Sequence, residues 1–80
     1  MVIPLCNTNP GDTVRIFCLD EGGQMAGRLS DLGFTPGAVV SCVLKKRGGH
    51  IAAYLVRNAV IALRKADSRF VMAEELEVAP

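Results

Sequence analysis

Apolar and polar residues alternate through several short stretches of this chain, a pattern of period two that is typical of β-strands. The pattern predicts strands over residues 13–19, 39–46, 51–57, 60–64 and 69–72. Between the first two strands, Met25, Leu29 and Leu32 recur at the helical spacing i, i+4, i+7. This spacing predicts one short amphipathic helix over residues 24–32, with these three side chains on its buried face.

Glycine and proline punctuate the same stretches and predict where the chain turns. Gly11 follows a proline and precedes the first strand, as in a tight turn. Gly33 ends the helix at the position where a left-handed cap is favoured, because glycine adopts positive φ without a Cβ clash. Pro36 and Gly37 occupy the two central positions of a type II turn, in which glycine supplies the positive φ.

The remaining segments are less regular. The strand over residues 39–46 is largely apolar on both faces, so we expect it to be central in the sheet or covered on each side. A tight turn is predicted at Asn58-Ala59, and residues 65–68 form a short helical or irregular connection. Residues 1–9 form an apolar lead-in, and the acidic residues 73–80 form either a solvated tail or an extension of an edge strand.

Composition agrees with a small β-rich fold. Half of the 80 residues are hydrophobic but only 5% are aromatic, so the core is aliphatic, and eight glycines with four prolines favour many turns. The pattern predicts a mainly β, small closed barrel of five to six strands with one short inserted helix. We find no repeat and no linker, so we expect a single domain over residues 1–80, with its core at about 3–72.

Charge argues against nucleic acid as a partner. Nine Lys and Arg against eight acidic residues leave a net charge of +1, and no stacking aromatic residues interleave with the basic ones. The densest basic stretch, Lys45-Lys46-Arg47, is interpreted as a solvated hairpin tip.

Three cysteines, Cys6, Cys18 and Cys42, follow neither a CxxC pair nor a disulfide framework. Cys18 and Cys42 are expected in the core. With no signal peptide and no span of ~20 apolar residues, the chain is expected to be cytoplasmic, with reduced thiols and no direct membrane insertion. These cysteines, His50 and the tail glutamates lack the close spacing of a structural metal site, so we expect no tightly held cofactor; weak transition-metal binding stays open.

No catalytic constellation is present. Three serines have only His50 as a candidate base, none lies in a nucleophile motif, and there is no phosphate-binding GxxxxGK[ST] loop. The sequence therefore predicts a protein that is not an enzyme.

The chain resembles the FeoA family along nearly its whole length, from about Ile3 to Met72. The resemblance rests on three blocks: residues 3–5 with 10–16, the run Gly27-Arg28-Leu29-Ser30-Asp31-Leu32-Gly33-Phe34-Thr35-Pro36-Gly37, and residues 54–57 with 61–64. It implies an SH3-like barrel and a cytosolic accessory protein of bacterial ferrous iron uptake. The partner it implies is FeoB, a membrane transporter with a cytosolic GTP-binding domain.

The same barrel forms the C-terminal domain of repressors resembling DtxR, which suggests the alternative of a stand-alone metal-responsive domain. For the partner contact, the outward residues of the helix and two arginines of the last hairpin are the candidates: Gln24, Arg28, Asp31, Arg57 and Arg64. Homo-oligomer formation stays open.

Overall fold

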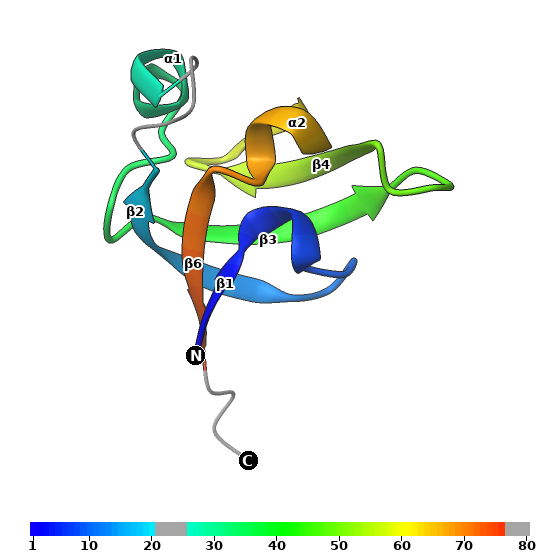
Figure 1. The fold of residues 1–80 in the computed structure, drawn as a ribbon, viewed down its shortest axis with the longest axis horizontal. Coiled ribbons are helices and arrows are strands. Elements are labelled where there is room, and N and C mark those ends of the chain that lie inside the picture. Colours follow the sequence, from blue (N-terminus) through cyan, green and yellow to red (C-terminus); the bar gives the residue numbers. More distant parts are fainter. Residues whose placement is uncertain (21–25, 77–80) are drawn as a thin grey trace.

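The computed structural model describes residues 1–20 and 26–76, and it is dominated by one antiparallel sheet. The six strands follow the order β1-β6-β2-β3-β4-β5 (Figure 1). In chain order, the elements are β1 (Val2–Pro4), the 3-10 helix η1 (Leu5–Asn7), β2 (Thr13–Leu19), α1 (Ala26–Asp31), β3 (Val39–Lys45), β4 (Ile51–Val56), β5 (Ala59–Arg64), α2 (Lys65–Ser68) and β6 (Val71–Glu75).

The sheet curls around a single aliphatic core. Register shifts in β2, between Ile16 and Cys18, and in β3, between Cys42 and Leu44, bend the strands where they occur. In the core, the rings of Phe34 and Tyr54 meet edge to face, with 6.3 Å between centroids. The mainly β fold with an inserted helix is therefore confirmed.

Closure of the barrel differs from the expectation. In the described part of the chain, β1 and β5 are the two ends of the hydrogen-bonded sheet and do not pair with each other. The short helices that follow them, η1 and α2, contact each other and bridge the gap. Because the bridge is not a ladder, the sheet keeps two strand edges.

Both ends of the chain extend the sheet further than the pattern predicted. The lead-in contributes β1, whose Val2, Ile3 and Pro4 pair with Glu74, Ala73 and Met72. The last strand occupies 71–75 rather than 69–72, and it lies between β1 and β2 rather than at an edge. Its buried Val71 and Ala73 alternate with more exposed residues, a period that the neighbouring glutamates obscured in the sequence.

The turn between β4 and β5 lies one residue earlier than predicted. Val56 pairs with Ala59, so the two turn residues are Arg57 and Asn58, with φ of 50° and 64°. Two consecutive positive φ angles define a type I′ turn, whose twist matches that of the strands. An arginine is unusual there, because residues other than Gly, Asn and Asp rarely adopt positive φ.

The helix ends in a Schellman motif, which orients the chain that leaves it. The Phe34 amide donates to the Leu29 carbonyl (2.9 Å) and the Gly33 amide donates to the Ser30 carbonyl (3.0 Å), while Gly33 has φ of +107°. Leu29 and Phe34 are both fully buried in the core cluster. Gly11 (φ +97°) and Gly37 (φ +91°) hold the positive φ of their turns.

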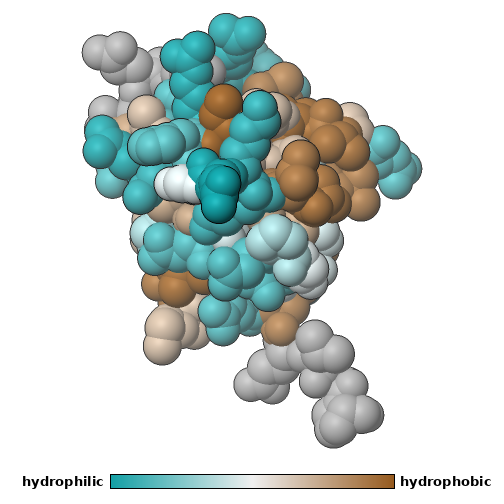
Figure 2. All heavy atoms as spheres, turned by 90° about the vertical axis from the view of Figure 1, so that its right-hand side faces the viewer, coloured by the Kyte–Doolittle hydropathy of each residue, from teal (hydrophilic) through white to brown (hydrophobic). Residues whose placement is uncertain are grey.

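The 39–46 strand is central in the sheet, between β2 and β4, as one of the two interpretations predicted, but it is not covered on both faces. The inner face, with Val40 and Cys42, is buried, but the outer face lies open together with those of β4 and β5. Figure 2 faces the end of the molecule where the β3–β4 hairpin projects, and apolar residues gather there beside hydrophilic ones. The large exposed aliphatic residues of these strands are Val39, Val43, Leu44, Ile51, Leu55 and Val60.

Two smaller predictions also change. Leu32 is not on the buried face of the helix but 36% exposed, because α1 is six residues long and ends before it. Cys18 is half-buried rather than in the core, since it follows the bulge in β2, whereas Cys42 is buried as expected. Met25 lies outside the described residues.

Candidate partner-binding surface

Two of the candidate arginines meet in one hollow between α1, β5 and α2. Arg28 reaches it from α1 and Arg64 from the end of β5, although 36 positions of sequence separate them. The hollow measures about 390 Å³. Its lining comprises Arg28, Leu32, Ala62, Leu63, Arg64 and Asp67. Two guanidinium groups, one carboxylate and three apolar side chains make it suited to a partner that carries both charge and apolar surface.

Arg57 lies at the border of the same region through its contact with the helix cap. A Cβ atom on Gly33 would lie 3.1 Å from Cδ and 3.3 Å from Nε of Arg57. The arginine stem therefore crosses the buried glycine that ends α1, and the β4–β5 turn is held against the helix. Backbone strain at an exposed arginine is a feature that functional positions tend to retain.

The other two candidates are not part of this hollow. Asp31 is exposed at the end of α1 but does not line it, and Gln24 lies outside the described residues. Leu32 and Ala62 line it although neither was a candidate partner-binding residue, and Leu32 was expected on the buried face of the helix. The signal that could have identified Ala62 was its place on the outward face of the last hairpin, and for Leu32 it was its adjacency to the cap.

Lys45 proves to be structural rather than part of a solvated hairpin tip. Its ammonium donates to the carbonyl oxygens of Cys6 (2.9 Å) and Thr8 (3.0 Å), and its side chain is half-buried. These bonds fasten the end of β3 to the chain that leaves η1, across 39 positions of sequence. Lys46 and Arg47 are exposed, as expected of a hairpin tip.

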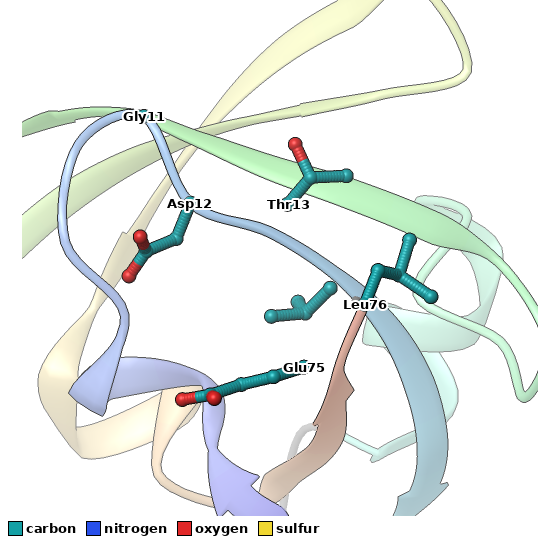
Figure 3. Close-up of a pocket in the computed structure, with 6 residues that line it drawn as sticks. Gly11, Asp12, Thr13, Glu75 and Leu76 are labelled. Carbon is teal, nitrogen blue, oxygen red and sulfur yellow. The ribbon is translucent and has the colours of Figure 1, made fainter. Parts of the chain in front are cut away.

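A second hollow opens between the turn that precedes β2 and the end of β6 (Figure 3). It measures about 220 Å³, and Asp12 and Glu75 contribute carboxylates to its lining. Oδ2 of Asp12 already accepts the Asn9 amide at 2.8 Å, as part of the turn that Gly11 completes. The carboxylate of Asp12 is thus explained by the turn.

Metal-ligating side chains are dispersed. Cys6 and Cys42 are buried, Cys18 is half-buried, and His50 is exposed on the β3–β4 loop. Within residues 1–20 and 26–76, no three His, Cys, Asp or Glu side chains come together in a way that could hold a metal ion.

One buried titratable group belongs to the core. The hydroxyl of Tyr54 lies 3.5 Å from the Leu5 carbonyl oxygen, close to the Thr8 and Ser68 hydroxyls. Burial raises the pKa of Tyr54 above its ordinary range, and the Ser68 hydroxyl opposes this rise. The phenol therefore stays neutral and ties β4 to η1.

The architecture defines a small SH3-like barrel, which resembles the C-terminal domain of metal-dependent repressors. A manganese-dependent transcriptional repressor in complex with manganese matches with a TM-score of 0.84 and 13% identity, over 94% of this chain but 37% of the repressor. The family model for the FeoA domain matches residues 3–75, so the chain belongs to the FeoA domain family.

Solved structures agree with this assignment. A FeoA-like protein from Clostridium acetobutylicum has a TM-score of 0.88 and 19% identity, covering 99% of this chain and 92% of that chain. The crystal structure of an iron uptake regulatory protein (FeoA) has a TM-score of 0.82 and 26% identity, covering 95% and 99%. Comparison with curated proteins returns no match. None of the described helices has the length and apolar character needed to cross a membrane.

Proposed function

We propose that this protein is a non-enzymatic accessory protein of bacterial ferrous iron uptake, which acts in the cytoplasm by binding the cytosolic region of a FeoB-type transporter. Membership of the FeoA domain family supports the pathway, as does the likeness to an iron uptake regulatory protein over nearly the full length of both chains. The partner is the one that the family resemblance implies.

The observation that carries a binding role is the exposed hollow beside α1. Arg28 and Arg64 are both exposed, and they share this hollow with Leu32 and Ala62. Arginine beside aliphatic surface is typical of protein interfaces, because the guanidinium makes several hydrogen bonds while its stem packs. Two of the three serines are placed for structure instead: the Ser41 hydroxyl bonds that of Thr13 at 2.9 Å, and Ser68 is buried.

Co-purification with the full-length transporter tests the proposal. The complex would be sought with the transporter bound to GTP, bound to GDP and free of nucleotide. A complex in any state supports the proposed function, and dependence on nucleotide would make the protein a regulator that responds to the GTPase state. Absence of a complex in all three states would overturn the choice of partner.

The alternative, a stand-alone metal-responsive domain, stays a prediction and is tested by the response of the protein to metal ions. Addition of Fe²⁺ or Mn²⁺ would then change the oligomeric state, measured by light scattering. A barrel that acts only through a protein partner would show no such change.

A further inference from the structure

Strand β5 ends the sheet and leaves one edge open. Its six residues contain no proline and no glycine, and its single charge is Arg64 at the last position. Val60 is 63% exposed, and Ala62 and Arg64 are also exposed. Natural edge strands usually carry a proline, a bulge or an inward charge against unwanted pairing, and β5 has none of these.

The register shows which backbone groups of β5 face outward. Val56 and Ala59 flank a two-residue turn, so this pair exchanges the hydrogen bonds nearest the turn. Hydrogen-bonded and non-hydrogen-bonded pairs alternate along an antiparallel ladder, which makes Val60 and Ala62 non-hydrogen-bonded positions. Their amides and carbonyls therefore point away from β4, where an added strand would lie.

The surroundings of this edge are cationic and apolar. Arg28 and Leu32 stand across the hollow from Ala62 and Arg64. Arg57 lies in the turn before β5, and Arg64 and Lys65 lie at its end, whereas Asp67 contributes one carboxylate to the lining of the hollow. An occupant of the edge thus meets positive charge at both ends of β5 and aliphatic side chains at its middle.

We propose that the edge of β5 binds an extended acidic segment of a protein partner, which adds to the sheet as a further strand. Its backbone would pair with that of Val60 and Ala62, and its carboxylates would meet Arg28, Arg57 and Arg64. Strand addition draws affinity from main-chain hydrogen bonds and specificity from alternate side chains. The inference rests on the proposed binding function and names the surface and chemistry of the contact.

A second copy of this chain is a poorer occupant of the same edge. Pairing β5 with β5 would bring two stretches without acidic residues together, so their arginines would repel. A membrane is also a poorer occupant, because the described part of this surface has no aromatic residue. The hairpin tip that projects furthest is polar, whereas interfacial membrane binders present aromatic and bulky apolar groups there.

The test uses a synthetic acetylated peptide of alternating glutamate and valine, about seven residues long to match a typical strand. Amide NMR shifts are followed while the peptide is added to the ¹⁵N-labelled protein. We expect the amides of Val60 and Ala62 to shift most and to gain protection from hydrogen exchange, with no response to a lysine–valine peptide. Shifts confined to other strands would overturn the inference.

The matched variants are Ala62→Pro and Ala62→Ser. Proline removes the outward N–H but no ladder bond to β4, so the strand should persist, whereas serine keeps the N–H. We expect at least a tenfold loss of peptide affinity for A62P and little change for A62S. Equal affinity for the two would contradict strand addition. Should A62P fail to fold, Ala62→Glu offers a second variant, whose charge should repel the acidic peptide equally strongly.

Two outcomes separate this inference from the proposed function. A complex of A62P with the transporter as tight as that of the wild-type protein would overturn the inference but leave the transporter as the partner. Peptide binding at β5 without any transporter complex would support the inference but overturn the transporter as the partner. Dimers that form with rising protein concentration and protect the β5 amides from hydrogen exchange would show that a second copy occupies the edge. That result would overturn the acidic segment as the occupant.

Discussion

The side chain of Arg57 lies across the backbone of Gly33, with Cδ 3.1 Å from the place where a Cβ atom on the glycine would be. Gly33 ends α1 and Arg57 forms the turn between β4 and β5, so this contact joins the inserted helix to the last hairpin. The two elements that border the candidate partner surface are thereby packed against each other. The contact requires glycine twice, once for its φ of +107° and once for the space it leaves.

Gly33→Ala should destabilise the protein by about 1–3 kcal/mol, because it forces positive φ on a residue with a Cβ and crowds Arg57. Urea unfolding measures the change. Gly27→Ala in the same helix is the matched control, since a Cβ there meets nothing within 4 Å and φ is not positive. We expect that control to stabilise the helix by about 0.5–1 kcal/mol. Equal effects of the two substitutions would show that the cap is unimportant.

Arg28→Glu should weaken transporter binding roughly tenfold, or about 1.4 kcal/mol, without unfolding the barrel. Arg28 is exposed and lines the hollow, so reversal of its charge alters the contact and leaves the core intact. Surface plasmon resonance with the transporter's cytosolic region gives the affinity, and circular dichroism confirms folding. Arg47→Glu on the hairpin tip controls for net charge. Unchanged affinity in folded R28E would remove this hollow from the candidate surfaces.

Lys45→Met should cost about 1–3 kcal/mol of stability, because the carbonyls of Cys6 and Thr8 lose the ammonium that bonds both. Methionine keeps much of the apolar stem, so packing changes little. Lys46→Met is the neighbouring control and should stay within about 0.5 kcal/mol, since Lys46 is exposed. Thermal unfolding of both variants measures the change in stability. A loss of stability in K46M but not in K45M would contradict the structural role of Lys45.

The free energy of unfolding should fall at alkaline pH because of Tyr54. Because burial raises its pKa in the folded protein, the folded state holds the phenol proton more tightly than the unfolded chain does. This contribution is complete below about pH 10, the pKa of the unfolded chain, and is lost as the pH rises towards the pKa of the folded protein. Tyr54→Phe should therefore flatten the fall in unfolding free energy that the wild-type protein shows above about pH 10. Parallel curves for the two proteins would refute this.

Much of the strand architecture could be predicted because its signals are local. Alternation located β2, β3 and β4 within one or two residues, and glycines at 11, 33 and 37 marked turns that need positive φ. The errors came from long-range pairing. β1 becomes a strand by pairing with β6 across about 70 residues, and β6 extends because two neighbours hydrogen-bond to it. Neither partner is visible in a local window.

The candidate surface was predicted in part. Exposure of Arg28, Arg57 and Arg64 could be inferred from the outward face of the helix and hairpin. That Arg28 and Arg64 meet in one hollow could not be inferred, because it depends on how α1 lies beside β5. The role of Lys45 was missed for the same reason, since charge in a run of three basic residues normally indicates solvent, and only the position of η1 provides carbonyl oxygens within reach.

The sequence by itself determined the class of fold, the aliphatic core and the positions where the backbone must turn, because hydrophobic period and positive φ are properties of single residues and their nearest neighbours. It also carried the family blocks by which the chain is recognised. Tertiary structure alone decided which faces remain open. Both faces of β3 are largely apolar in the sequence, yet Val40 and Cys42 are buried while Val39 and Val43 are exposed, because a curled sheet of this size encloses a single core.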